Sequence, residues 1–320
     1  MRLVFRADAT SKIGSGHVMR SSVLAEHAIS EGYKCIFIGK VEDLPWVSNR
    51  MENLGFIEIH KDFETFRSNI DEDVLVLDSY SIPANLDDIQ LEKWRLVVTI
   101  SDSLTPQYSA HLVIIPGLTE EFEIRKGKKV LSGTKYILIR KSINKKNDLN
   151  IQSEKLKIIV NGGGTNVHSF AETIAEKLDS LNIDLEAYFF TDFEIQSKTG
   201  KRFISYKIGP DLDSIAANSD IAITTASTSA LEFLAREIPI GVVCAVENQK
   251  EFYKQLGEFG YAIQLGNFIK SEGWHLNLGN LQDLVQNVAT QKKIRNKIAN
   301  LIDFDGASRI LTEIVNEFDK

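Results

Sequence analysis

The sequence has only two cysteines and no long apolar stretch. Cys35 and Cys244 are too few and too far apart for a disulfide framework, and no cysteine and histidine cluster has the spacing of a zinc site. No apolar run reaches the ~18 residues of a membrane-spanning helix, and the first residues read as a strand rather than a signal peptide. We therefore expect a cytoplasmic protein without a membrane span.

A net positive charge is also lacking, because 44 Asp and Glu outnumber 37 Lys and Arg and the net charge is -7 at pH 7. The chain therefore lacks the basic footprint of a nucleic-acid-binding protein, and a bound anion would be held by backbone groups and a few placed side chains. The 320 residues, 43% hydrophobic and 25% charged, describe an ordinary globular protein that is too long for one core. We expect two domains. Nothing in the sequence indicates an oligomeric partner.

In the first part of the chain, short apolar runs alternate with amphipathic runs. Predicted strands lie at residues 3–5, 34–39, 57–60, 73–78, 96–100 and 112–115, and predicted helices at 18–29, 43–55, 63–69 and 86–94. This alternation is typical of βαβ units, in which a parallel sheet is covered on both faces.

A polar segment at 141–154 reads as a linker, and the same alternation resumes after it. Predicted strands lie at 156–160, 185–190, 203–207, 221–224, 240–245 and 262–265, and predicted helices at 169–181, 213–218, 229–237, 248–259 and 281–320, the last with a break at 303–306. The sequence thus predicts two facing, doubly wound, Rossmann-like α/β domains with a ligand cleft between them. The predicted boundaries are 1–145, 146–305, and a C-terminal helix at 306–320 that packs back on the first domain.

Residues 8–20 form a glycine-containing turn between the first predicted strand and helix. Gly14 and Gly16 let the backbone adopt positive φ and approach a ligand that faces the free N–H groups of the helix. His17 stands at the helix start, where the dipole favours the neutral imidazole that can accept a proton. The alternative is a plain tight turn with a surface or capping histidine.

A second glycine turn, Gly-Gly-Gly-Thr, follows the first predicted strand of the second domain. The N–H groups around Gly163 and Gly164 could cradle a phosphate, although a hinge would have the same composition. Thr228 and Ser229 open a later helix, and their hydroxyls could bind a diphosphate as well as cap the helix. Glu232, one turn further on, could accept hydrogen bonds from a ribose.

Two further groups follow predicted strands. The amides of Asn248 and Gln249 suit the neutral hydroxyl or acetamido groups of a sugar, but Asn248 could equally be a helix N-cap. Tyr80 comes just after the strand that ends at Asp78, where α/β folds gather catalytic groups. Its phenol could donate to a developing charge, or its ring could simply cover the edge of the core.

Taken in order, these motifs resemble the PseG hydrolases of pseudaminic acid biosynthesis and the related SpsG-like proteins. The resemblance runs over most of the chain. It is carried by residues 5–20, Asp78-Ser79-Tyr80, the helix start leading to Glu232, Glu247-Asn248-Gln249, and the Asp-Gly-Ala-Ser-Arg run at 305–309. The resemblance implies the GT-B architecture, which MurG-type glycosyltransferases share.

The resemblance also implies an activity: hydrolysis of UDP-2,4-diacetamido-2,4,6-trideoxy-β-L-altropyranose by water attack at the anomeric carbon, with inversion and without a metal or other cofactor. His17 matches the family's proposed general base, and Tyr80 matches a second catalytic position. Positions implied to bind the sugar are Asp8, Gly14, Gly16, Arg20, Asn248 and Gln249. Positions implied to bind UDP, on the second domain, are Gly163, Gly164, Thr228, Ser229 and Glu232. The product would serve the glycosylation of flagellin or a surface polysaccharide.

The chain departs from the family pattern at residues 100–102, where Ile-Ser-Asp replaces the common Ile-Asp-Asp, at residues 115–117, and at Thr165. These positions flank the sugar side of the expected cleft. We therefore expect them to affect which sugar is accepted more than the reaction.

Two other functions fit the same architecture. A nucleotide-sugar glycosyltransferase would use the base to activate an acceptor hydroxyl in place of water. Its membrane-associated members usually carry a basic, apolar patch on the first domain, whereas residues 61–73 are mostly acidic or polar. A UDP-sugar-binding protein without catalysis is the third alternative, and the intact His17 and Tyr80 disfavour it.

Overall fold

The computed structural model describes the chain except for residues 11–12, 103–106, 120–128, 144–154 and 210. The chain divides into two compact units: unit 1 is Met1–Arg140 with Asp303–Lys320, and unit 2 is Lys141–Ile302. The division falls at 140/141, where the sequence predicted 145/146, and the chain returns to unit 1 at Asp303. The predicted linker lies outside the described residues apart from 141–143.

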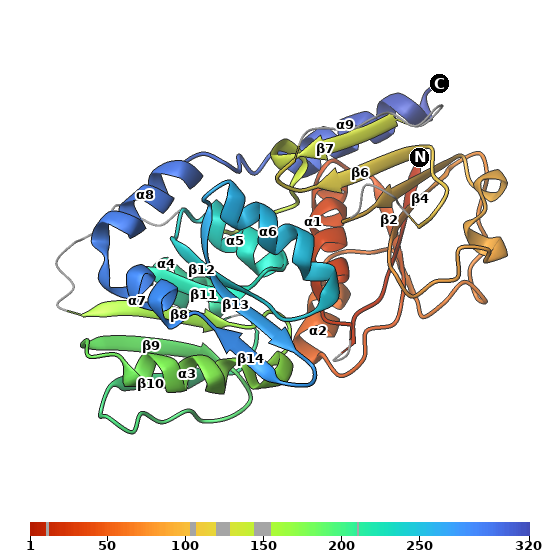
Figure 1. The fold of residues 1–320 in the computed structure, drawn as a ribbon. Coiled ribbons are helices and arrows are strands. Elements are labelled where there is room, and N and C mark those ends of the chain that lie inside the picture. The colour runs from red at the N-terminus through yellow and green to blue at the C-terminus, as the bar shows by residue number, and fades with distance from the viewer. Residues whose placement is uncertain (11–12, 103–106, 120–128, 144–154, 210) are drawn as a thin grey trace. The chain divides into compact units, whose positions relative to one another are not determined.

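Unit 1 contains a parallel sheet in the order β3-β2-β1-β4-β5-β6-β7 (Figure 1). The strands are β1 Arg2–Ala7, β2 Lys34–Ile38, β3 Glu58–His60, β4 Asp73–Asp78, β5 Leu96–Ile100, β6 Leu112–Pro116 and β7 Lys129–Gly133. The chain moves outward from β1 to β3, then crosses back to β4 on the other side of β1. This is the doubly wound order, and its switch point lies between β1 and β4.

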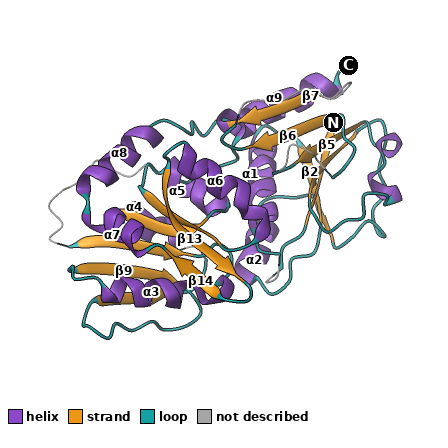
Figure 2. Ribbon diagram, in the orientation of Figure 1, coloured by secondary structure: helices purple, strands orange, loops and turns teal. Residues whose placement is uncertain are grey.

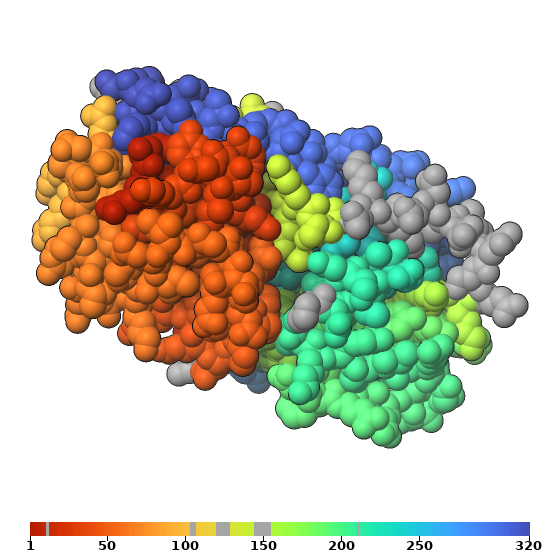
Figure 3. Space-filling view, turned by 180° about the vertical axis from the view of Figure 1, so that it is seen from behind, coloured from red at the N-terminus to blue at the C-terminus, as the bar shows by residue number. Residues whose placement is uncertain are grey.

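Both faces of this sheet are buried, which explains the nearly continuous apolar strands. Val74 and Val76 of β4 belong to one core cluster, whereas the alternating Leu75 and Leu77 belong to a cluster on the other face. The first cluster packs against the helices of unit 1, which are α1 Gly16–Ser30, α2 Pro45–Asn53 and α9 Gly306–Phe318. Helix α9 packs beside α1, and Figure 3 shows the blue C-terminal segment lying against red and orange residues.

Two predicted helices of unit 1 are wrong. Residues 63–69 form a turn and no helix. Phe63 and Phe66, three residues apart as in a helix, both bury their rings against Trp94 from this turn. Residues 86–94 form two short 3₁₀ helices, Asp87–Ile89 and Leu91–Lys93. The extended Gln90 separates them, and its side chain donates to the Leu86 carbonyl at 2.8 Å.

Unit 2 repeats the topology, with strands in the order β10-β9-β8-β11-β12-β13-β14 (Figure 2). The strands are β8 Leu156–Asn161, β9 Leu185–Phe190, β10 Arg202–Tyr206, β11 Ile221–Thr225, β12 Ile240–Cys244, β13 Ala262–Ile269 and β14 Gly273–Leu276. The helices are α3 Phe170–Ser180, α4 Leu212–Ala217, α5 Thr228–Ala235, α6 Lys250–Glu258, α7 Leu278–Gln286 and α8 Val288–Ile298. The corresponding switch point lies between β8 and β11.

Some elements differ from the sequence-based expectation. The sequence did not predict β7 or β14, and β14 pairs antiparallel with β13 as a hairpin at the edge of an otherwise parallel sheet. Strand β13 continues to Ile269, well past the expected end at residue 265. The C-terminal helical stretch has a second break at Asn287, whose side chain accepts from the N–H of Ala289 at 3.0 Å and caps α8.

The core of unit 2 holds one polar group without a hydrogen-bond partner among the described residues, the Thr224 hydroxyl on β11. Replacing Thr224 by the isosteric valine should raise the free energy of unfolding by about 1 kcal/mol, because it removes a desolvated hydroxyl at little change in volume. Urea unfolding measures this. The neighbouring Thr225→Val is the matched control and should destabilise, since the Thr225 hydroxyl donates to the Gly162 carbonyl at 3.2 Å. A less stable Thr224→Val variant would contradict the prediction.

Candidate functional site

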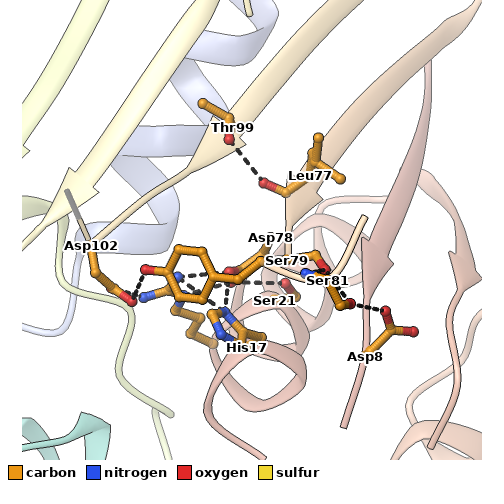
Figure 4. Close-up of polar contacts among 11 residues, drawn as sticks. Asp8, His17, Ser21, Leu77, Asp78, Ser79, Ser81, Thr99 and Asp102 are labelled. Atoms are coloured by element: carbon orange, nitrogen blue, oxygen red, sulfur yellow. Dashed lines mark hydrogen bonds and ion pairs between the residues drawn. The ribbon is translucent and has the colours of Figure 1, made fainter. Parts of the chain in front are cut away.

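The candidate site of unit 1 lies at the carboxyl ends of β1, β4 and β5, next to the switch point of the sheet. Helix α1 begins just after β1 and carries His17 and Arg20 on one face, since they are three residues apart. Strand β4 ends at Asp78, and Asp102 follows β5. Figure 4 shows the side chains of His17, Asp78 and Asp102 converging at one edge of the sheet, and Arg20 binds both carboxylates there. Parallel strands bring their carboxyl ends together, so residues distant in sequence meet here.

His17 and Asp78 form a close pair. The Nδ1 atom of His17 lies 2.6 Å from Oδ1 of Asp78, and the Asp78 side chain is fully buried. A carboxylate at this distance accepts a hydrogen bond from Nδ1–H, which leaves Nε2 as the nitrogen with an available lone pair. The pair therefore holds the imidazole in the tautomer that a general base needs.

Arg20 keeps Asp78 ionised. Its Nε and Nη2 atoms donate to the two oxygens of Asp78 at 2.5 and 2.7 Å. Burial alone would raise the pKa of the Asp78 carboxyl, but the charge of Arg20 and the hydrogen bonds from Arg20 and His17 lower that pKa below its ordinary value. The buried carboxylate is therefore available as the partner of His17 at neutral pH.

Tyr80 and Asp102 form the exposed side of the cluster. The Tyr80 hydroxyl donates to Oδ2 of Asp102 at 2.6 Å, and Nη1 of Arg20 donates to Oδ1 of the same residue. Burial, and then the charge of Asp102, raise the pKa of the Tyr80 phenol. The Tyr80 ring stands edge-to-face to the His17 ring, with centroids 4.8 Å apart at 84°. The tyrosine thus contacts the imidazole directly.

The turn before α1 differs in part from its prediction. Gly14 has φ of 84° and donates its N–H to the Thr10 carbonyl at 2.8 Å, so the positive φ expected there is present. The expectation for Gly16 is wrong, because it is the first residue of α1 and has no positive φ. Asp8 lies apart from His17 and accepts from Arg6 at 2.7 Å and from Ser81 at 3.0 Å (Figure 4).

In unit 2 the glycine turn and the hydroxyl-rich turn come together at the switch point between β8 and β11. Gly163 has φ of 102°, and a Cβ atom there would lie 3.7 Å from Ser227 Oγ and 3.9 Å from both Ser229 Oγ and Thr225 Oγ1. Thr225 ends β11, and its hydroxyl lies 3.0 Å from that of Ser227. Hydroxyls therefore surround the position where a side chain on Gly163 would stand. Gly164 continues the turn and is partly buried.

Helix α5 starts at Thr228, and both Thr228 and Ser229 are partly buried in its first turn. The N-cap residue is Ser227, whose side chain makes no capping hydrogen bond. Glu232 is partly buried one turn later. The start of this helix therefore presents hydroxyl groups to the glycine turn that do not cap the helix.

The predicted amide pair lies elsewhere in unit 2, in a short 3₁₀ helix, Glu247–Gln249, that leads into α6. Asn248 is exposed, and the N-cap of α6 is Gln249, so the capping alternative for Asn248 is wrong. The Gln249 Oε1 atom accepts from the Ala245 N–H at 2.9 Å, which fixes the amide at the end of β12. The described contacts do not bring this pair to the glycine turn.

The sequence analysis missed two members of the unit 1 cluster, Asp78 and Asp102. The available signal was their position, because each acid follows an apolar strand and the two strands are adjacent in a doubly wound order. No group of three or more metal-ligating side chains occurs in the described part of the chain. Likewise, no helix within the described ranges is long and apolar enough to cross a bilayer.

No family model matches the chain. A hydrolase from Campylobacter jejuni, UDP-2,4-diacetamido-2,4,6-trideoxy-beta-L-altropyranose hydrolase, is 23% identical over 278 residues, which cover 82% of this chain and 99% of the relative. Among solved structures, MurG from Acinetobacter baumannii has a TM-score of 0.67 at 14% identity, over 99% of this chain and 100% of that one. The spinosyn forosaminyltransferase SpnP has a TM-score of 0.64 at 12% identity, over 99% of each. The chain therefore has the GT-B fold, with two Rossmann-like domains, and is PseG-like in sequence.

Proposed function

We propose that the protein hydrolyses a UDP-linked diacetamido-trideoxy sugar to the free sugar and UDP, as the name of its Campylobacter relative describes. The observation that carries the proposal is the His17 and Asp78 pair, with 2.6 Å between Nδ1 and Oδ1. The coarser part, an enzyme that acts on a UDP-sugar, is supported by the similarity to this relative over 82% of the chain. The hydrolytic part is supported by the activity that the relative's name describes, and the oriented base with a buried carboxylate behind it would activate the water.

In the proposed reaction, Nε2 of His17 takes a proton from water while the water oxygen bonds to the anomeric carbon. The bond from that carbon to the β-phosphate oxygen breaks, and UDP leaves with the electron pair. Attack opposite the leaving group inverts the anomeric configuration. Asp78 stabilises the imidazolium that forms, and the proton then returns to solvent. UDP is a good leaving group, so no strong general acid is needed.

We assign the UDP to unit 2, at the turn that contains Gly163 and Gly164. Hydroxyls of Thr228 and Ser229 would donate to the diphosphate at the start of α5, and Glu232 would accept from the ribose. On unit 1, Gly14 and Gly16 would bring the backbone close to the substrate. Arg20 and Asp8 remain proposed contacts to the substrate, and their bonds to Asp78 and to the Lys40 N–H would also organise the site.

Asn248 and Gln249 remain proposed contacts to the sugar, and Tyr80 remains a proposed catalytic residue beside His17. Tyr80 is 41% exposed and Asn248 is also exposed, so both side chains reach solvent. The amide of Gln249 is anchored by its oxygen to the Ala245 N–H, which would direct its NH₂ group outward. The amides of Asn248 and Gln249 could bind the acetamido groups of the sugar without adding charge.

The decisive experiment is turnover of the UDP-diacetamido sugar in ¹⁸O-labelled water. Label in the free sugar shows that water attacked the anomeric carbon. Label in the phosphate of UDP would refute the proposal, because it shows cleavage of the other bond. Polarimetry or NMR during the reaction reports the configuration of the first product.

A glycosyltransferase is the second candidate, since the similar solved structures include a forosaminyltransferase and MurG. It predicts no turnover in water alone and a rapid reaction once a hydroxyl acceptor is added. The same ¹⁸O experiment with and without an acceptor separates the two functions.

Replacing Gly163 by alanine should weaken UDP binding about tenfold, or ~1.4 kcal/mol. The methyl group would stand among the hydroxyls of Ser227 and Ser229, at a residue whose φ is 102°. Isothermal titration calorimetry with UDP measures the change. Gly200→Ala is the matched control, because Gly200 also has a positive φ, 86°, but a Cβ there has no atom within 4 Å. If wild type and Gly163→Ala bind UDP with equal affinity, the diphosphate does not bind at this turn.

A further inference from the structure

Asp102 is bound more tightly than the fold requires. Its side chain is 45% exposed, yet it accepts from both Arg20 and Tyr80. Arg20 is buried and needs a counter-ion, but Asp78 already supplies one through two contacts. Asp102 stabilises the buried Arg20 charge together with Asp78. Its second oxygen binds the Tyr80 hydroxyl, a contact that the Arg20 charge does not require.

The Tyr80 ring shows what this contact does. Tyr80 is 41% exposed, so packing leaves much of the ring uncovered, while its hydroxyl is bound to Asp102 at 2.6 Å. The ring is edge-to-face with His17 at a centroid distance of 4.8 Å. The ring is therefore held at two places, at its edge by the imidazole and at its hydroxyl by Asp102.

Arg20 links the two halves of the cluster. One edge of its guanidinium binds Asp78, the partner of His17, and Nη1 binds Asp102, the partner of Tyr80. The planar guanidinium fixes the directions of both bonds, since its donors form a rigid fork. The two carboxylates, and with them His17 and Tyr80, are thereby held in one arrangement.

We propose that Asp102 is a positioning residue: its carboxylate, held by Arg20, binds the Tyr80 hydroxyl and so fixes the Tyr80 ring against the His17 imidazole. The proposal deepens the proposed function, and its catalytic part rests on it. Asp102 acts through Tyr80 and takes up no proton in the reaction. In hydrolysis it preserves the geometry of the base, and small displacements of a catalytic group are costly.

The first test needs no turnover. The ring-current field of Tyr80 acts on the ring protons of His17, so the Hε1 resonance of His17, assigned with His17→Gln in protein carrying ¹³C-labelled histidine, reports where the Tyr80 ring stands. In Asp102→Ala this resonance should move in the same direction as in Tyr80→Ala. Asp213→Ala is the control, because Asp213 pairs with the buried Arg236 in unit 2. If the His17 Hε1 resonance stays at its wild-type position in Asp102→Ala, the proposal is overturned.

The second test is kinetic and uses the double variant. Asp102→Ala and Tyr80→Phe should each lower kcat about tenfold with KM changed less than about twofold, and the double variant should be no slower than the slower single variant. If the two losses multiply, Asp102 acts independently of Tyr80, for instance by contacting the substrate, and the proposal is overturned. If wild type shows no hydrolysis, the proposed function fails, whereas the NMR test still decides whether Asp102 positions Tyr80.

Discussion

Replacing His17 by glutamine should lower kcat for hydrolysis of the UDP-diacetamido sugar by about 10²- to 10⁴-fold. Glutamine retains a polar side chain of similar reach but cannot accept the proton from water. The fully buried Asp78 then has no imidazole to orient or to neutralise. The Kd for UDP should stay within about twofold of wild type, because we assign UDP to unit 2. Initial rates of UDP release and calorimetry with UDP measure the two quantities.

His275→Gln serves as the control for this substitution. His275 lies on β14 of unit 2 with a 48% exposed side chain and pairs with Glu272 at the surface. Its loss should leave both kcat and UDP affinity unchanged. If His17→Gln has the wild-type kcat, His17 is not the general base. The proposed hydrolase mechanism would then lack the base that the resemblance implies.

The second large effect concerns stability. Gly306→Ala should lower the free energy of unfolding of unit 1 by about 3 kcal/mol, because a Cβ there would stand 2.2 Å from the Ile137 carbonyl oxygen. The obstacle is backbone, so no rotamer change relieves it. Helix α9 would have to shift away from α1 and expose Ile310 and Ile314, which are fully buried. Urea unfolding, and proteolysis of the loosened helix under native conditions, measure the change.

Gly279→Ala provides the matched comparison for that substitution. Gly279 is the second residue of α7, and the nearest atom to a Cβ there is Asn277 Oδ1 at 3.4 Å. Alanine is the better helix former, so this variant should be as stable as wild type or more so. If Gly306→Ala is equally stable, the close approach of α9 to residue 137 is not required for docking.

Much of the fold could be predicted because its strands are buried on both faces. The runs at β4, β5 and β9 are mostly apolar or aromatic and are bounded by turn residues or by an acid, and their observed limits equal the predicted ones. The edge strands β7 and β14 are less visible in the sequence. Strand β7 has only two buried residues among its five positions, and β14 is only four residues long. Their pairing depends on neighbours that local sequence does not show.

The wrong helices have a common cause. Phe63 and Phe66 are three residues apart, a spacing that places two side chains on the same side in a helical turn and also in a tight turn. Which of the two forms depends on Trp94, a residue distant in sequence, against which both rings pack. At 86–94 the Gln90 side chain donates to the Leu86 carbonyl, the acceptor that a backbone N–H would use in a helix. Gln90 itself is extended, so the helix is interrupted there. Tertiary contacts outweigh local propensity in both cases.

The candidate site could be predicted in outline but not in its pairing. The spacing of Arg20 from His17 is local and places both on one helical face. Their partners Asp78 and Asp102 come from strands that are 58 and 82 residues distant from Arg20, and only the strand order brings them to one edge. The sequence likewise offered Tyr80 as a donor to a developing charge or as a ring at the edge of the core, and did not show that its hydroxyl is bound to Asp102.

The return of the chain to unit 1 at Asp303 sets the order in which the protein can fold during synthesis. Unit 2 is continuous in sequence, so its core can close as soon as residue 302 has left the ribosome. The core of unit 1 lacks the side chains of α9 until later, among them Ile310, Leu311 and Ile314. At ~5–20 residues per second, the first-made domain therefore waits roughly 8 to 30 seconds with an open apolar face while the second is made. We expect this nascent intermediate to be the species that chaperones recognise.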